Sequence, residues 1–276
     1  STRKESSAAS DVYKRQTPDN GVATAIYAAC KATVKVGDGK EITLHEETNY
    51  PFEEAIAFTV STGEKVAFPF YLRIPSWTKG AEVRVNGKKV SVTPVAGKYL
   101  CINREWANGD CVELTLPMSL SMRTWQVNKN SVSVDYGPLT LSLKIAEKYV
   151  EKDSRETAIG DSKWQKGADS KKWPTTEIYP DSPWNYSLVL DKKEPLKNFK
   201  VIRKSWPTDN YPFTVASVPL EVKAIGRPVP EWKIDETGLC GVLPEEDAVK
   251  GDKEEITLIP MGASRLRISA FPNTKE

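Results

Sequence analysis

The sequence predicts an all-β protein, with two antiparallel β-sandwich domains in tandem. Apolar residues alternate with polar ones in many short runs, which is the pattern of half-buried strands. Turn residues such as Asn86-Gly87 separate these runs, and Asn-Gly favours the tight turn of a β-hairpin because both positions need positive φ. No convincing amphipathic helix is found, and a length of 276 residues suits two modest domains.

The first predicted domain spans residues 21–118. Its alternating runs predict about seven short strands, and two such sheets packed face to face form a sandwich. The runs are 34–36, 42–44, 56–60, 68–74, 83–85, 90–92, 100–102 and 112–116. Hairpins are predicted at Gly37-Asp38-Gly39, at Asn86-Gly87 and at Asn108-Gly109-Asp110.

The second predicted domain spans residues 119–276 and carries long loops. Its expected strands lie at 132–134, 139–145, 188–190, 199–202, 218–222 and 256–258, with a turn at Tyr136-Gly137-Pro138. Residues 147–187 are rich in Lys, Asp, Ser, Pro and Trp. Linkers seldom carry three tryptophans, so we expect a long, partly ordered excursion here.

Residues 1–20 are expected to form a disordered tail outside both domains. The segment is polar, has no strand or helix period, and lacks the apolar core of a signal peptide. The stretch SAASDVYKRQ resembles translated sequencing-adaptor sequence. We therefore interpret this tail as non-native and expect the native chain to begin further upstream.

Composition excludes several classes of function. Lys and Arg number 39 and Asp and Glu number 37, so the net charge of +2 gives no general attraction to nucleic acid. No apolar run is long enough to predict a membrane span. A single histidine, His45, excludes sites that need several imidazoles. The four cysteines form no CxxC pair, which excludes a zinc ribbon.

Few residues are candidates for catalysis. His45 falls on the polar face of its strand and is interpreted as exposed. Glu46-Glu47 and Glu53-Glu54 are interpreted as surface charge, although Glu47 and Glu53 could meet in space and act as paired carboxylates. The cysteines carry no sign of an activated thiol. Cys30 is interpreted as a small buried residue, and Cys101 and Cys111, which flank a predicted hairpin, either form a disulfide or remain free.

Tryptophans are the candidates for glycan binding, because an exposed aromatic ring can stack on a sugar. The alternative is that they pack in the core or at an interface. Four of them fall in predicted surface loops rich in proline: Trp164, Trp173, Trp184 and Trp206.

Six stretches together resemble one enzyme family, glycoside hydrolase family 127 (GH127), the β-L-arabinofuranosidase-like proteins of gut and environmental bacteria. They are NYPFEEAIAFTV, FPFYLRIPSWTKGAEVRVNGKKV, KYLCINREWANGDCVELTLPM, VDYGPLTLSL, EIYPDSPWNYSLVL and ITLIPMGASRLRISAFP. The resemblance implies a catalytic (α/α)6 barrel followed by two β-sandwich domains. It also implies that catalysis uses a zinc-bound cysteine and glutamates of the barrel. This sequence lacks the family's adjacent cysteine pair, so no catalytic role is carried over to Cys30 or to any other residue.

The resemblance leads to one expectation for function. We expect a non-catalytic C-terminal portion of a glycoside hydrolase, with no cofactor of its own and with zinc in the catalytic domain. Its expected partners are that barrel and, through it, a plant-type glycan with terminal β-L-arabinofuranosyl linkages; the family favours a periplasmic or extracellular location. The alternatives are a carbohydrate-binding module that uses the loop tryptophans and a self-contained enzyme that uses Glu47, Glu53 or His45. A surface that packs on the barrel in the whole enzyme should be an exposed apolar patch on this chain alone. We expect residues 22–36 to contribute most to this patch.

Overall fold

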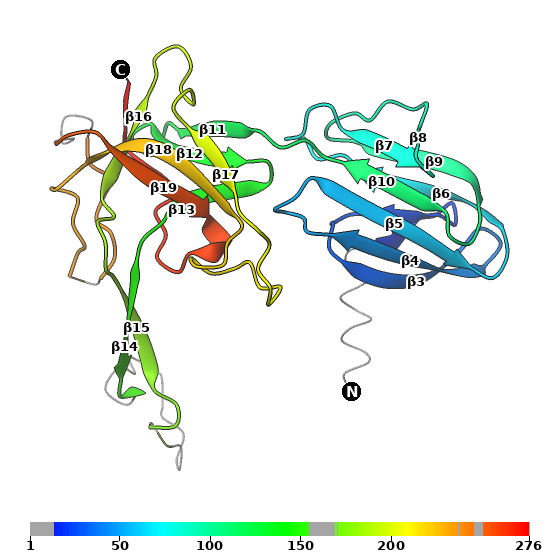
Figure 1. The fold of residues 1–276 in the computed structure, drawn as a ribbon, viewed down its shortest axis with the longest axis horizontal. Helices are drawn as coiled ribbons and strands as arrows, with labels where there is room; N and C mark the ends of the chain where they lie inside the picture. The colour runs from blue at the N-terminus through cyan, green and yellow to red at the C-terminus, as the bar shows by residue number, and fades with distance from the viewer. Residues whose placement is uncertain (1–13, 155–168, 170, 237, 246–250, 276) are drawn as a thin grey trace. The chain divides into compact units, whose positions relative to one another are not determined.

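The structure, a computed structural model, describes residues 14–154, 169, 171–236, 238–245 and 251–275. It divides into two compact units, Ser1–Leu120 with Tyr136–Leu139 and Ser121–Asp135 with Thr140–Glu276. Strands form the framework of both units (Figure 1), so the predicted all-β class is confirmed. No helix in the described part of the chain is long and apolar enough to cross a membrane.

Two sheets make up the first unit. The four-stranded sheet has the order β1 (Lys14–Gln16), β2 (Val22–Thr24), β6 (Val66–Arg73) and β9 (Tyr99–Trp106). The six-stranded sheet has the order β3 (Cys30–Val36), β4 (Lys40–Thr48), β5 (Ala55–Thr62), β10 (Cys111–Thr115), β7 (Glu82–Val85) and β8 (Lys88–Lys89). Neighbouring strands are antiparallel except for β2 and β6, which are parallel.

Aromatic side chains join the two sheets at the core of the first unit. Phe58 of β5 and Phe70 of β6 belong to different sheets, and their rings meet edge to face with centroids 5.3 Å apart. Trp106 is fully buried and donates from Nε1 to the carbonyl oxygen of Phe68 at 3.0 Å, which satisfies its polar atom within the core. The apolar residues of β2 to β7, β9 and β10 thus face one shared core, as a sandwich requires.

Two predicted hairpins are confirmed by pairing and by backbone conformation. β3 and β4 pair across the turn at Gly37 and Gly39, whose φ values are +52° and +85°. β7 and β8 pair across Asn86 and Gly87, at φ +50° and +75°. Local turn chemistry therefore fixed both connections.

The predicted hairpin at Asn108-Gly109-Asp110 is wrong. β9 lies in the four-stranded sheet and β10 in the six-stranded sheet, so the chain crosses from one sheet to the other at this turn. The backbone of the turn instead pairs with β5: the N–H of Gly109 donates to Val60, and the N–H of Val60 donates to Asp110.

Part of the expected tail is ordered. Residues 1–13 lie outside the described residues, but β1 pairs with β2 and the following turn contacts the sandwich. The hydroxyl of Tyr71 donates to Asp19 Oδ2 at 2.5 Å, and the N–H of Gly37 donates to the carbonyl oxygen of Asn20 at 2.8 Å. The expectation of disorder was therefore wrong for residues 14–20.

One sheet and one ribbon make up most of the second unit. The sheet has the order β11 (Leu120–Trp125), β12 (Ser131–Tyr136), β13 (Leu139–Leu143), β19 (Glu254–Pro260), β18 (Leu220–Pro228), β16 (Tyr186–Leu190) and β20 (Asn273–Lys275), and β17 (Lys200–Arg203) pairs with β18. β16 and β20 are parallel. A short 3-10 helix, η2 (Met261–Ala263), follows β19.

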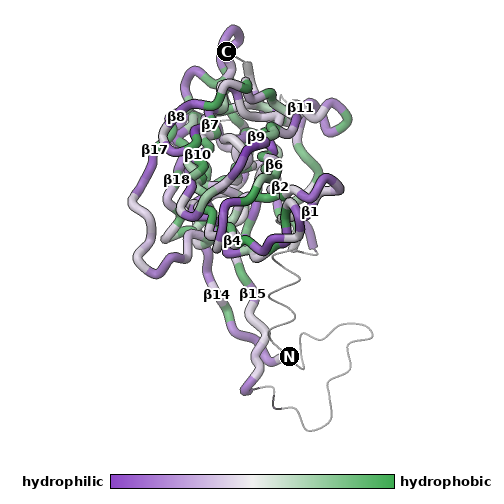
Figure 2. Tube along the Cα trace, turned by 90° about the vertical axis from the view of Figure 1, so that its right-hand side faces the viewer, coloured by the Kyte–Doolittle hydropathy of each residue, from purple (hydrophilic) through white to green (hydrophobic). Residues whose placement is uncertain are grey.

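The excursion predicted within 147–187 contains a two-stranded ribbon. β14 (Glu147–Lys152) and β15 (Thr175–Pro180) pair with each other, and the ribbon extends away from the eight-stranded sheet (Figures 1 and 2). Glu147 ties its base to the unit, because its Oε1 accepts the backbone N–H of Arg265 at 2.8 Å.

Candidate functional site

The candidate tryptophans lie in different surroundings. Trp164 lies outside the described residues. Trp173, which precedes β15, is 72% exposed. Trp184, which precedes β16, packs edge to face on Trp232 with ring centroids 5.2 Å apart. Trp206 follows β17 and donates to Asn210 Oδ1 at 2.7 Å. The described rings come from separate elements, and their role in glycan stacking stays a prediction.

His45 and Glu47 lie on the solvent side of β4, with 3.8 Å between His45 Nδ1 and Glu47 Oε1. Glu53 is also exposed, whereas Glu54 accepts the backbone N–H of Met118 at 3.0 Å. Exposed carboxylates in bulk solvent lack the low-dielectric setting that tunes a catalytic acid.

Glu46 corrects the interpretation of these acidic residues as surface charge. Its side chain shares the inner face of β4 with Ile42 and Leu44 and is fully buried. Its Oε1 accepts the N–H of Ala28 at 3.0 Å, and Cys30 Sγ lies 3.9 Å from its Oε2. The sequence contained the signal, since residues 42, 44 and 46 share one face of a strand.

A buried tyrosine stands beside Glu46. The hydroxyl of Tyr27 donates to the carbonyl oxygen of Arg73 at 2.5 Å, and its ring meets that of Tyr50 with centroids 5.8 Å apart. Burial raises the pKa of Tyr27, and the nearby Glu46 carboxylate adds to this effect. The cluster anchors the segment between β2 and β3 to the sandwich, which is a structural role.

None of the four cysteines, all of which the structure describes, forms a disulfide. Cys101 and Cys111 lie on β9 and β10, which belong to different sheets, so no hairpin brings them together. Burial raises the pKa of the Cys111 thiol, and the charges of Glu113 and Glu47 raise it further. A raised pKa disfavours the thiolate, so Cys111 is not an activated nucleophile. Cys30 is half-buried rather than fully buried.

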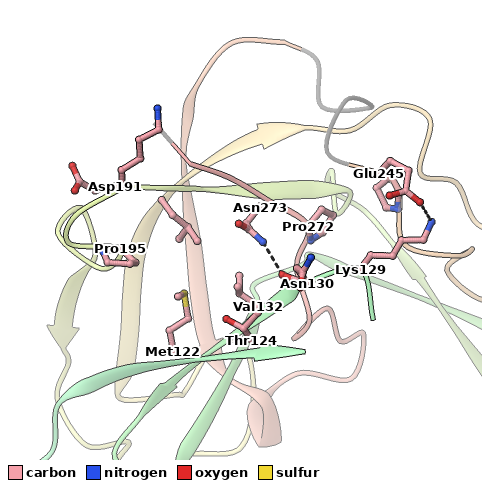
Figure 3. Close-up of a pocket in the computed structure, with 13 residues that line it drawn as sticks. Met122, Thr124, Lys129, Asn130, Val132, Asp191, Pro195, Glu245, Pro272 and Asn273 are labelled. Atoms are coloured by element: carbon pink, nitrogen blue, oxygen red, sulfur yellow. Dashed lines mark hydrogen bonds and ion pairs between the residues drawn. The ribbon is translucent and has the colours of Figure 1, made fainter. Parts of the chain in front are cut away.

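A polar cavity of about 520 Å³ opens in the second unit beside the turn that precedes β12 (Figure 3). Met122 and Val132 contribute apolar side chains, while Lys129 pairs with Glu245 at 2.6 Å. Asn273 Nδ2 donates to the carbonyl oxygen of Asn130 at 2.9 Å. These contacts tie the lining residues to one another.

Two carboxylates line this cavity, Asp191 and Glu245, and Figure 3 places them on opposite sides of it. Backbone N–H groups of Glu194 and Lys193 donate to Asp191 and lower the pKa of its carboxyl. Glu245 is ion-paired with Lys129. Glycoside hydrolysis by two carboxyl groups needs one that holds a proton at working pH, and the environment of Asp191 favours the anion instead.

Two further cavities, of about 370 and 400 Å³, share Ile178, Arg265 and Arg267 and therefore adjoin. Aromatic, aliphatic and arginine side chains dominate them. We call this region the aromatic–arginine surface, defined by Ile178, Tyr179, Trp184, Tyr211, Phe213, Ile234, Leu239, Cys240, Arg265 and Arg267. Of these residues, only Trp184 is predicted from the sequence to bind a ligand. Cys240 has no role that the sequence predicts.

The apolar patch expected within residues 22–36 is small. Ile26 is the one large hydrophobic residue of this segment that is exposed. Several exposed hydrophobic residues lie instead on the aromatic–arginine surface of the second unit: Tyr179, Tyr211, Phe213, Ile234 and Leu239. Over the residues that the structure describes, no three His, Cys, Asp or Glu side chains converge as a metal site would require.

Comparison with known proteins identifies relatives of the chain. Residues 21–118 match the family model of the GH127 β-L-arabinofuranosidase middle domain. A GH127 β-L-arabinofuranosidase from Geobacillus stearothermophilus T6 is 22% identical, over 95% of this chain and 35% of that chain, with a TM-score of 0.61. A glycoside hydrolase is 21% identical, over 96% and 38%, with a TM-score of 0.63.

A GH127 β-arabinofuranosidase is also similar, with 21% identity over 94% of this chain and 36% of that chain and a TM-score of 0.59. No curated protein matches. The chain thus spans 35–38% of the length of these solved relatives and shares their fold there. The resemblance to the β-sandwich portion of GH127 proteins is confirmed, and the first unit contains the region that matches the middle-domain model.

Proposed function

We propose that this chain supplies non-catalytic β-domains to a GH127 glycoside hydrolase that as a whole hydrolyses terminal β-L-arabinofuranosyl or related linkages. In this proposal the two units support the catalytic (α/α)6 barrel. The observation that carries it is the match of nearly the whole chain to a limited part of solved relatives, together with the middle-domain match of residues 21–118.

The chemistry of the described candidates supports a structural role. Inside the sandwich, the Glu46 carboxylate accepts the backbone N–H of Ala28. Backbone hydrogen bonds hold Asp191 as an anion, and burial disfavours the thiolate of Cys111. None of these settings is that of an acid, base or nucleophile tuned for catalysis.

A hydrolysis assay tests the proposal. The chain is incubated with 4-nitrophenyl β-L-arabinofuranoside, Zn²⁺ and a thiol reductant, and release of nitrophenol is followed. We expect no turnover above the buffer rate. Turnover that is lost in a variant with Cys30, Cys101, Cys111 or Cys240 changed to Ala would contradict the proposal.

The DNA that precedes the coding region supplies a second test. We expect an open reading frame that encodes a helical barrel domain with an adjacent cysteine pair. A neighbouring sequence that encodes no such domain would count against a role as barrel support.

One observation, the 72% exposure of Trp173, favours the alternative of a carbohydrate-binding module. Affinity electrophoresis in gels that contain arabinan separates the two functions. Retardation of the chain that Trp173→Ala or Trp184→Ala abolishes would support glycan binding by these rings, whereas equal mobility with and without arabinan supports the role proposed here.

A further inference from the structure

The aromatic–arginine surface has the composition of a protein–protein interface. Aromatic residues and arginine are enriched at the centre of such interfaces, and Lys, Glu and Asp are depleted there. Among the described residues, no Lys, Glu or Asp lines either of the two adjoining cavities, although 28% of the chain is charged. Leu239 is 66% exposed, Tyr211 50% and Phe213 45%. Adjoining exposed apolar residues of this kind mark an interaction site.

The backbone that presents these side chains is held in place. Asp235 donates its N–H to the carbonyl oxygen of Leu239 at 2.7 Å, and its Oδ1 accepts the N–H of Leu239 at 3.0 Å. Trp232 packs on Trp184 and donates from Nε1 to the carbonyl oxygen of Gly241 at 2.9 Å. A preformed surface loses little conformational entropy on binding, which favours association.

The charge of the surface indicates the chemistry of its partner. Arg265 and Arg267 line both cavities and bring two positive charges to the surface, while the Glu147 carboxylate contacts the backbone N–H of Arg265. Arg267 Nε donates to the carbonyl oxygen of Ser264 at 2.8 Å, which orients its guanidinium. Two arginines at the margin of an apolar surface complement a partner face that combines carboxylates with apolar side chains.

We propose that the aromatic–arginine surface docks an acidic, apolar face of the catalytic domain of the same glycoside hydrolase. This inference rests on the proposed function. The larger part of each solved relative lies outside the region that this chain matches, so such a protein offers the second surface within one polypeptide. The aliphatic residues Ile178, Ile234 and Leu239 fit polypeptide side chains better than the hydroxyl groups of a sugar.

Cys240 is a native probe of this contact, because its thiol is exposed and lines one of the two cavities. Its rate of reaction with a maleimide is measured by peptide mass spectrometry, in this chain and in the full-length enzyme that joins the chain to its catalytic domain. We expect a rate at least about tenfold lower in the full-length enzyme. Val127→Cys, at a fully exposed site of the same unit, is the reference and should react equally in both proteins.

Variants in the full-length enzyme test the chemistry of the contact. Arg265→Glu with Arg267→Glu should restore the reaction of Cys240 by about tenfold, and so should Leu239→Ser with Phe213→Ser. Arg84→Glu with Val92→Ser, both on the first unit, should leave it unchanged. The same changes in this chain should leave its unfolding temperature within about 2 °C of the parent value, which separates docking from folding.

Each contrary outcome is distinct. Equal labelling of Cys240 in the chain and in an active full-length enzyme overturns the docking surface but leaves the proposed function intact. Absence of any catalytic domain from the full-length protein overturns both. Slow labelling of Cys240 in the chain by itself also overturns the inference. If that slow rate depends on protein concentration, a second copy of the chain covers the surface; if it does not, the first unit covers it. Protection by arabino-oligosaccharides would assign the surface to glycan instead.

Discussion

Asp110, at the turn between β9 and β10, is held as an anion inside the first unit. Burial raises the pKa of its carboxyl, but the N–H of Ala107, the amide of Asn86 and the charge of Arg104 outweigh this effect and lower the pKa below its usual value. The stabilisation is therefore complete above the unfolded pKa of about 3.9, and it is lost as the pH falls through the folded pKa.

Asp110→Asn is expected to lower the free energy of unfolding at pH 7 by about 1–3 kcal/mol, because charge-assisted hydrogen bonds are lost. It should also flatten the fall in stability below pH 4. Urea unfolding at pH 7 and pH 3 measures both effects, with the exposed Glu113→Gln as the matched control on β10. A variant with the same acid dependence as the parent would argue against this role of Asp110.

Glu46 illustrates what the sequence predicts at the scale of a residue. The alternation of Ile42 and Leu44 predicts the outward face of His45 and, by the same rule, the inward face of Glu46. Composition argues the opposite, because a glutamate is seldom fully buried unless it has a partner. The partner, the N–H of Ala28, arrives from a segment that lies outside the strand. Periodicity thus predicts that Glu46 lies on the inner face of its strand. The contact with Ala28, which permits the burial of its carboxylate, depends on the tertiary fold.

The turn between β3 and β4 holds two glycines at positive φ, but only one of them has close neighbours. A Cβ on Gly37 would lie 2.7 Å from the carbonyl oxygen of Ala67 on β6, whereas a Cβ on Gly39 would meet nothing within 4 Å. Gly39→Ala is expected to cost about 1–2 kcal/mol, the penalty of the left-handed backbone. Gly37→Ala should cost more, because backbone must also move.

Thermal unfolding of the two variants measures this difference. Since both glycines have positive φ, the comparison isolates the approach of the turn to β6. Equal losses of stability would mean that the turn moves away from Ala67 without cost.

The predicted hairpins differ in how far their local sequence determines the pairing of their strands. Asn86 and Gly87 carry their own conformational preference, so the β7–β8 turn follows from a local signal. The turn at Gly109 carries a similar signal but connects two sheets. Both sheets of a sandwich present the same alternation of apolar and polar residues, so the pattern that defines a strand leaves the choice of its partner to the tertiary fold.

Convergence of distant segments explains why the aromatic–arginine surface could not be predicted from the sequence. Its residues come from 178–184, 211–213, 234–240 and 265–267, on four separate parts of the second unit. The sequence of each segment, taken alone, predicts a loop or a strand end with a few aromatic or basic residues. Their common position depends on the pairing of β14 with β15 and on the loops that follow β17, β18 and β19, which no local pattern encodes.

Separate cores predict separate unfolding transitions for the molecule as a whole. Leu114 belongs to the core of the first unit and Leu220 to that of the second, and both are almost fully buried. Leu→Ala at either site removes apolar contacts and is expected to cost about 2–5 kcal/mol. In differential scanning calorimetry, Leu114→Ala should lower one transition and Leu220→Ala the other. If either change moved both transitions together, the two units would unfold as one cooperative body, because a defect in one core can lower the other transition only through coupling between them.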